Sequence, residues 1–241
     1  MRRLLVLILA LLPFAGQAGS SVGQLYKTGG TIDISRAGRT VMADTGSPIE
    51  VGDTLEVGLG EAAALRMADD EVVSLGASTR FQLLSYQFNP RDRSGNHARY
   101  RLDSGTARLI SGLIAQQQPG AVVLESDYGM VSTLGTDYSA SVCGAGCATP
   151  GIFVSVNSGK VTVSTPAGSQ TASAGQIVFV AAVGGAPVLV ASLPAGLIPA
   201  PDPTPLLLTA GILGSTLRIE FTASVCDEAA SPTQPECTAS R

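Results

Sequence analysis

The stretch "VSTLGTDYSASV" (131–142) combines a turn with a strand. Gly135 and Thr136 stand in the middle, and the residues after them alternate in polarity. One side would carry Tyr138, Ala140 and Val142, and the other Asp137, Ser139 and Ser141. Such a period of two is typical of a strand with one buried face. The stretch therefore predicts a half-buried strand after a tight turn, in which a side chain on Gly135 would be strained.

Short segments of the same kind fill the chain from residue 31 to residue 192. Examples are "ARYRL" (98–102), "TARLI" (106–110), "AVVLES" (121–126) and "KVTVST" (160–165). The composition agrees, because 28 glycines and only 14% charged residues do not suit helical surfaces. We predict an all-β fold, either a sandwich or jelly-roll-like arrangement or a short irregular β-solenoid. No fixed repeat is visible, which favours the sandwich. Only "SGLIAQQQ" (111–118) is predicted to be helical.

The first 18 residues have the pattern of a secretory signal peptide. Two arginines precede an apolar run (4–12), and Gly16 and Ala18 supply the small residues of a cleavage site. The run is shorter than the roughly 20 residues of a membrane-spanning helix. We therefore expect cleavage after Ala18 and a periplasmic or secreted protein without a stable membrane span.

The rest of the chain divides at a proline-rich stretch. Residues 19–193 form the predicted β domain. Residues 194–205, "PAGLIPAPDPTP", hold five prolines and are predicted to be a semi-rigid linker. Residues 206–241 contain one strand-like segment, "TLRIEF" (216–221), and then a polar tail. That strand either returns to an edge of the main sheet or awaits a partner.

The charge of the chain argues against a nucleic-acid partner. The formal net charge is −4, and it becomes −6 when Arg2 and Arg3 leave with the signal peptide. No dense group of lysines and arginines is present to neutralise phosphates. The arginines of the longest polar loop, Arg91, Arg93, Arg99 and Arg101, could contact an anion, but the simpler interpretation is a solvated loop.

No residue pattern points to catalysis, a metal or a cofactor. His97 is the only histidine, and it lies in a polar loop instead of beside an acid as a catalytic triad requires. Together with Cys143 and Cys147 it does not make a convincing zinc site. A hydrolase would need a carboxylate pair in a deep cleft, which a sequence alone does not reveal.

Three acids in succession, Asp69, Asp70 and Glu71, mark a turn. A calcium loop is one interpretation of such a run. However, calcium loops alternate their oxygen ligands, whereas these acids are adjacent and are followed by two valines. The run is therefore predicted to be the solvated tip of a hairpin.

Four cysteines in a chain with a secretory leader predict disulfides. Cys143 and Cys147 flank the flexible tripeptide "GAG", and Cys226 and Cys237 lie in one polar tail with two prolines between them. We predict the pairs Cys143–Cys147 and Cys226–Cys237. The alternative joins the tail to the 143–147 loop.

Several phrases, in order, resemble the FecR-like domain. The most recognisable motif of that family has a threonine before a Gly-Thr pair, then an aromatic residue and a valine. Thr133, Gly135, Thr136 and Tyr138 match it, and Ala140 replaces the valine. The family commonly has Asp-Gly in the turn that Asp69, Asp70 and Glu71 form here, so this turn should be less tight. The matching phrases, spread over about residues 45–182, are "VGDTLEVGLGEAAALRM" (51–67), "DDEVVSLGASTRFQL" (69–83), "YRLDSGTARLI" (100–110), "VSTLGTDYSASV" (131–142), "VSVNSGKVTV" (154–163) and "ASAGQIVFV" (172–180).

The resemblance implies an extracytoplasmic β module rather than an activity. Well-known members of the family are transmembrane regulators of iron uptake with a cytoplasmic anti-sigma segment. Here the apolar run begins at residue 4, so we do not expect the sigma-factor role to transfer. The expected function is binding or scaffolding in the cell envelope, through sheet edges or loops that engage another envelope protein. The alternative is a component of an envelope signalling system that works beside a separate membrane regulator.

Overall fold

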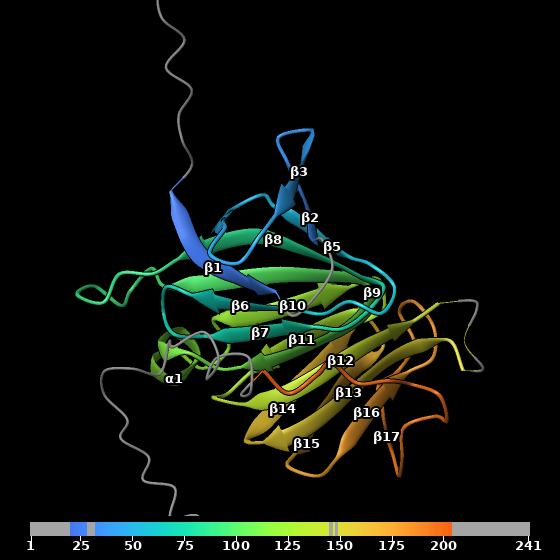
Figure 1. The fold of residues 1–241 in the computed structure, drawn as a ribbon. Coiled ribbons are helices and arrows are strands. Elements are labelled where there is room, and N and C mark those ends of the chain that lie inside the picture. The colour runs from blue at the N-terminus through green and yellow to red at the C-terminus, as the bar shows by residue number, and fades with distance from the viewer. Residues whose placement is uncertain (1–19, 28–31, 145–146, 148, 204–241) are drawn as a thin grey trace, which may run out of the picture.

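The protein is built almost entirely of β-strands, as the sequence predicts. A computed structural model describes residues 20–27, 32–144, 147 and 149–203, and within these ranges it contains seventeen strands and one short helix (Figure 1). The helix α1 (Leu113–Gln117) lies inside the segment that was predicted to be helical. The predicted signal peptide, the segment "TLRIEF", Cys226 and Cys237 lie outside the described residues.

The strands form two sheets that share one long strand, β9 (His97–Ile110). The first half of β9 pairs with β8 and β10, and its second half, from Gly105 onward, pairs with β7 and β12. Four strands that precede β9 in the chain lie on one side of it in each sheet, and four that follow it lie on the other. The pairing of β9 with β10 is parallel, and the others are antiparallel.

Sheet A contains, in spatial order, β4 (Pro48–Glu50), β1 (Ser21–Lys27), β6 (Ala63–Met67), β7 (Val72–Leu75), the second half of β9, β12 (Asp137–Cys143), β13 (Gly151–Ser158), β16 (Ile177–Val180) and β17 (Val188–Val190). Sheet B contains β3 (Arg39–Ala43), β2 (Ile32–Arg36), β5 (Thr54–Val57), β8 (Thr79–Gln87), the first half of β9, β10 (Val122–Ser126), β11 (Gly129–Thr133), β14 (Lys160–Thr165) and β15 (Gly168–Ser173).

The core lies between the two sheets and consists of one continuous apolar cluster. Leu65, Val73 and Leu109 face it from sheet A, and Phe81 and Tyr100 face it from sheet B, where their rings stack with centroids 5.3 Å apart. Burial of this side-chain surface is the main stabilising contribution that the fold offers. The two-sheet arrangement agrees with the sandwich that the absence of a fixed repeat favours.

The proline-rich segment does not leave the domain at residue 194. Its described part, 194–203, contains no strand and lies against sheet A. Ala200 is buried, and Ser74 Oγ of β7 donates a hydrogen bond to the carbonyl oxygen of Pro201 at 2.8 Å. Proline removes the donors that a strand would need, which explains the lack of pairing. The segment is therefore part of the domain surface, whereas the sequence predicted a linker.

Candidate binding groove and a buried acid cluster

The Gly-Thr motif forms a corner at which the chain passes from sheet B to sheet A. Thr133 ends β11, and Asp137 begins β12. Between them Gly135 has a φ of +75°, and the hydroxyl of Thr136 donates a hydrogen bond to the carbonyl oxygen of Lys160 at 2.6 Å. The amide of Thr136 donates to Ser111 Oγ at 2.8 Å. These bonds hold the corner to two neighbouring segments, so Gly135 and Thr136 have a structural role.

The other two motif residues, Thr133 and Tyr138, point into the interior. Thr133 and Tyr138 are buried, and the hydroxyl of neither has a hydrogen-bond partner among the described residues. Burial, together with the charge of Glu71, raises the pKa of Tyr138 well above its ordinary value. The motif therefore brings two unpaired hydroxyl groups into the core, and that of Tyr138 lies near the charge of Glu71.

The acidic turn is not the solvated hairpin tip that the sequence predicted. Asp69 and Glu71 are 0% and 1% exposed, and only Asp70 faces the solvent. Asp70 adopts a φ of +66°, the left-handed conformation that glycine would take without strain, and pairs with Arg66 at 2.6 Å. The two flanking acids point inward because tyrosines of sheet B donate hydrogen bonds to them. These tyrosines are distant in the sequence, so the residues next to the turn do not predict its burial.

Asp69 is fully bonded and holds helix α1 against the turn. Its Oδ1 atom accepts a hydrogen bond from the hydroxyl of Tyr86 at 2.8 Å, and its Oδ2 atom accepts one from the amide of Ile114 at 3.0 Å. The carbonyl oxygen of Asp69 accepts a further bond from the amide of Leu113 at 2.8 Å. A buried carboxylate with this many donors links β6, β8 and α1.

Glu71 is less well satisfied. The hydroxyl of Tyr100 donates a short hydrogen bond to its Oε2 atom, but its Oε1 atom has no partner among the described residues. Burial and then the charge of Asp69 raise the pKa of Glu71 to about 8, and the bond from Tyr100 opposes this. Glu71 is therefore protonated in the folded protein at neutral pH. Because the pair is enclosed, it does not form the open carboxylate cleft that a hydrolase would need.

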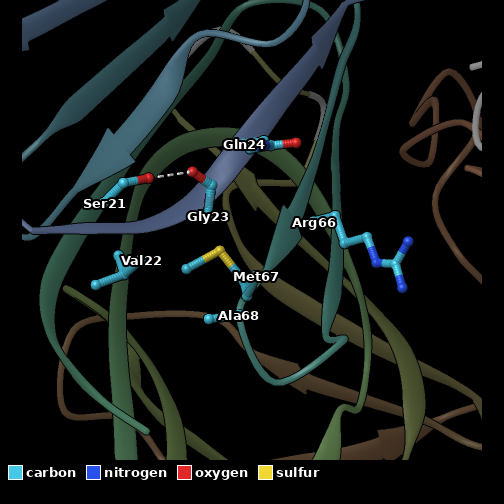
Figure 2. A pocket seen from close by; sticks show the side chains of 7 residues that line it. All are labelled: Ser21, Val22, Gly23, Gln24, Arg66, Met67 and Ala68. Atoms are coloured by element: carbon cyan, nitrogen blue, oxygen red, sulfur yellow. Dashed lines mark hydrogen bonds between the residues drawn. The ribbon is translucent and has the colours of Figure 1, made fainter. Parts of the chain in front are cut away.

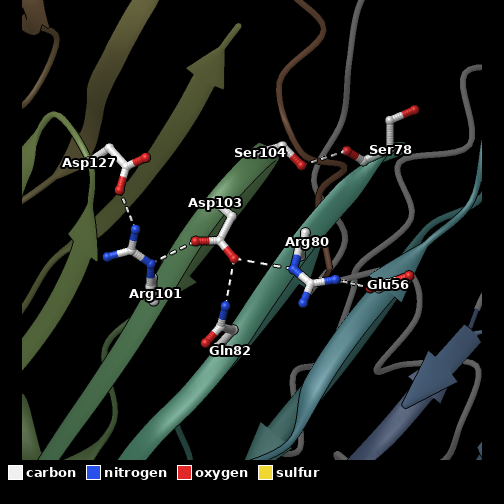
Figure 3. A network of polar contacts seen from close by, with 8 residues as sticks. All are labelled: Glu56, Ser78, Arg80, Gln82, Arg101, Asp103, Ser104 and Asp127. Carbon is white, nitrogen blue, oxygen red and sulfur yellow. Dashed lines mark hydrogen bonds and ion pairs between the residues drawn. The ribbon is translucent and has the colours of Figure 1, made fainter. Parts of the chain in front are cut away.

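Two arginines of the polar segment, Arg99 and Arg101, form ion pairs on sheet B, and Arg101 belongs to the ladder of ion pairs in Figure 3. Arg101 pairs with Asp103 at 2.6 Å and also with Asp127, while Arg80 pairs with Asp103 at 3.3 Å and also with Glu56. Arg99 pairs with Glu125, and Arg91 and Arg93 are exposed in their loop. The exposed loop agrees with the solvated interpretation, but Arg99 and Arg101 are paired. Exposed pairs contribute about 0–1 kcal/mol each, so the ladder sets register and solubility more than stability.

His97 lies at the start of β9, where its Nδ1 atom is 2.9 Å from the carbonyl oxygen of Gly95. Within the part of the chain that the structure describes, no acidic side chain forms an ion pair with it. Within the described ranges, no three His, Cys, Asp or Glu side chains gather closely enough to hold a metal ion. In the same residues, no helix is long and apolar enough to cross a bilayer.

An apolar groove of about 1000 Å³ lies at one end of the sandwich, and we take it as the candidate binding site. Four turns and loops and the proline-rich segment line it: residues 59–62, 76–78, the bend of β9 at Gly105 and Thr106, the loop closed by Cys143 and Cys147, and residues 194–201. Among the described lining residues Glu61 is the only ionisable one, and it accepts a hydrogen bond from the amide of Gly58 at 3.2 Å. The groove is therefore almost uncharged.

Two large aliphatic side chains stand exposed at this groove. Leu59 is 89% exposed and Ile198 is 79% exposed. Neither residue was predicted from the sequence, because Leu59 lies in a turn beside Gly60 and Ile198 lies in the proline-rich segment beside Pro199. The only signal was the presence of a large aliphatic residue where a turn usually carries a polar one. Their exposure next to an apolar groove is what marks the site.

A second hollow, of about 330 Å³, lies where β1 runs beside β6 (Figure 2). Val22 and Met67 supply its apolar surface, and the hydroxyl of Ser21 donates a hydrogen bond to the carbonyl oxygen of Gly23 at 2.9 Å. Arg66 is its one charged residue, and its guanidinium group pairs with Asp70. The hollow is smaller and presents no free polar group of its own, so the groove is the better candidate.

One wall of the groove carries the predicted disulfide between Cys143 and Cys147, whose Cα atoms are 5.7 Å apart. The bond closes a short loop, so its entropic contribution is modest, about 2 kcal/mol. Its effect is local, because it fixes the chain where β12 ends beside the groove.

The second pair, Cys226–Cys237, remains a prediction. Since Cys143 and Cys147 are bonded to each other, we expect non-reducing peptide mapping of the protein to yield two linked peptides, one from each short loop. The control is the same digest after reduction, in which both linked masses should disappear. A peptide that joins the 143–147 region to the tail, or four free thiols, would contradict the pairing.

Comparison with known proteins leaves the family open. No family model matches the sequence, and no curated protein matches it. Two crystal structures, at 1.65 Å and 2.50 Å resolution, are each of a candidate anti-sigma factor from Parabacteroides distasonis ATCC 8503. The first is 17% identical with a TM-score of 0.44 and covers 57% of this chain and 58% of its own; the second is 19% identical with a TM-score of 0.46 and covers 67% and 64%. This chain thus spans about three fifths of those structures, and likenesses this weak carry no functional argument.

Proposed function

We propose that the protein is a binding module of the cell envelope, which engages another envelope protein through the apolar groove. The observation that carries the proposal is the exposure of Leu59 and Ile198 beside an almost uncharged groove. On protein surfaces, exposed apolar patches of this kind mark interaction sites, whereas scattered single apolar residues do not. The envelope location follows from the leader-like residues 1–18 and from the resemblance to the FecR-like domain, and it belongs to the proposal.

The lining favours an apolar polypeptide segment as the occupant. A volume of about 1000 Å³ is at the upper end of small-molecule sites. Small-molecule sites also place a few convergent polar groups to orient the ligand, whereas Glu61, the one ionisable lining group, is bonded to its own turn. A partner segment with uncharged, branched side chains would pack against Leu59 and Ile198 without burying a charge.

The walls of the groove are well fixed. The disulfide closes one wall, and the hydroxyl of Thr79 holds the bend of β9 by accepting from the amide of Thr106 at 3.0 Å. A preformed site loses less conformational entropy when the partner arrives. The same module could serve scaffolding or, as the alternative, envelope signalling beside a membrane regulator, and the identity of the partner separates these roles.

The test is site-specific photocrosslinking in intact cells, with the crosslinking residue placed at position 59 or position 198. We expect both positions to give the same adduct. With the partner purified, Leu59→Asp combined with Ile198→Asp should weaken binding by at least about tenfold, because a charge would be buried in an apolar contact.

Met42 provides a matched control. It is 74% exposed on the edge strand β3 and does not line the groove. Crosslinking from position 42 should not give the adduct, and Met42→Asp should leave the affinity unchanged. Equal crosslinking from all three positions, or equal loss of affinity in both variants, would overturn the groove as the binding site.

A further inference from the structure

The outer face of sheet A, the side turned away from the core, carries several small side chains at its centre. One row of outward residues crosses four neighbouring strands in register: Ala64 of β6, Ser74 of β7, Arg108 of β9 and Ser139 of β12. Three of these four side chains are small. A row of small residues lets another segment of chain approach a sheet closely.

These outward residues are also protected from solvent. Ala64 and Ser74 have no exposed surface, and Val72 and Ser139 are each 8% exposed. Neither Ala64 nor Val72 belongs to the apolar cluster between the sheets. Ala64 and Val72 are therefore buried although they lie outside the core between the sheets.

The proline-rich segment crosses this face in a definite direction. The Cα atom of Ala200 lies 3.6 Å from where a Cβ atom on Gly76 would be. Pro201 then accepts the hydrogen bond from Ser74, and Asp202 pairs with Arg108 at 3.6 Å. The chain thus moves from the groove along β7 and β9, and Pro203 is buried in turn. The next outward row along this path contains Val72 and Ile110, which pair across the two strands.

We propose that the outer face of sheet A is a docking surface for the segment that follows, residues 204–213. This stretch, "TPLLLTAGIL", contains no charged residue and places Leu206, Leu207 and Leu208 directly after the described path. Successive rows on one face of a strand are about 7 Å apart, and five extended residues span up to about 17 Å. An extended chain of that length is therefore long enough to reach the row of Val72 and Ile110 from the end of the described path.

Because residues 204–213 are covalently attached to the domain, a small apolar contact would be enough to dock them on sheet A. Docking of a segment connected to the domain is an intramolecular event, with an effective concentration that can reach the millimolar range. It would also hold residues 194–201, one wall of the groove, between β17 on one side and the docked segment on the other. The proposal concerns a surface separate from the groove, so it can fail while the proposed function stands.

The test measures the accessibility of the covered face in the full chain. Val72→Cys introduces one thiol on that face, in a background in which Cys226→Ser and Cys237→Ser remove the tail cysteines. We expect a bulky maleimide to label this thiol at least about tenfold faster when Leu206, Leu207 and Leu208 are all changed to Asp. Asp202→Lys, which acts on the described part of the path, should give a smaller increase.

Two controls separate release of the segment from unfolding. Three added charges farther along the chain, at Ala229, Ala230 and Ser231, should leave labelling of the cysteine at position 72 unchanged. A cysteine at position 188, where Val188 is 48% exposed on β17, should react equally fast in all the variants. Equal labelling of position 72 with and without the three leucines would overturn the proposal, and so would fast labelling of both sites before any substitution.

Discussion

Replacement of Glu71 by glutamine should make the protein more stable above pH 8 and remove most of its pH dependence between about pH 5 and pH 8. The pKa of Glu71 is raised from an ordinary 4.5 to about 8 by burial and by the charge of Asp69. In the unfolded chain the side chain regains its ordinary pKa. The folded state therefore binds a proton that the unfolded state has released across this whole interval.

The sign of the effect follows from that difference in bound protons. Below about pH 4.5 both states are protonated, so Glu71 costs nothing. As the pH rises through the interval, the free energy of unfolding falls by at most about 1.4 kcal/mol per pH unit. This fall is complete above about pH 8. We expect a total of about 3–5 kcal/mol, which glutamine would not lose because it carries no charge.

Urea unfolding at pH 5, 6, 7, 8 and 9 measures this directly, with the transition slope as a check that the same surface is exposed. The matched control is Asp70→Asn in the same turn, where the native side chain is 63% exposed and the change should stay within about 0.5 kcal/mol. Parallel pH profiles for Glu71→Gln and the native protein would show that Glu71 is ionised in the folded state and would contradict the prediction.

Gly105→Ala should lower the free energy of unfolding by about 3–4 kcal/mol. Gly105 lies where β9 leaves sheet B for sheet A, with a φ of +82° that costs any other residue about 1–2 kcal/mol. A Cβ atom there would also lie 2.3 Å from Thr79 Oγ1 and 2.5 Å from Thr79 Cα. Relief requires Thr79 to move, which breaks the hydrogen bonds that its hydroxyl makes with the backbone of Thr106.

Gly135→Ala is the matched control for the steric part of this effect. Its φ of +75° is similar, but no atom lies within 4 Å of the Cβ position. We expect a loss of only about 1–2 kcal/mol. Thermal melts of both variants should differ by several degrees, because 1 kcal/mol corresponds to about 2–4 °C for a domain of this size. Equal melting temperatures would mean that β9 tolerates a side chain at its bend.

Local patterns in the sequence were enough to predict the fold class. Strands such as β12 and β14 alternate apolar and polar residues, and the alternation identifies both as strands. It also identifies the buried face of β14, but β12 is not the half-buried strand that its alternation predicts, because Ser139 and Ser141 on its polar side are only 8% and 3% exposed. The helix was predicted in the right segment. Three strands, β1, β3 and β15, were missed, because Gly23 interrupts the first and the other two are mostly exposed edge strands. β3 and β15 bury few side chains, so their sequences show no regular alternation of apolar residues.

The join between the sheets was not predictable from local pattern. Residues 98–102 and 106–110 look like two strands separated by a turn at "DSG", yet they are the two halves of β9. A glycine between two strand patterns permits both a hairpin and a bend. Only the partners decide, because β8 and β10 pair with one half while β7 and β12 pair with the other.

The sequence by itself determined the all-β class, the helix and the short disulfide loop, because each depends on residues that are neighbours in the chain. Tertiary structure alone decided that Asp69 and Glu71 are buried. Their local sequence predicts solvated side chains, but Tyr86 and Tyr100 of sheet B donate hydrogen bonds to them in the interior. Tertiary structure also decided the groove, whose walls come from turns more than 100 residues apart, such as 59–62 and 194–201. Burial and concavity are properties of segments brought together, and no window of the sequence contains both sides.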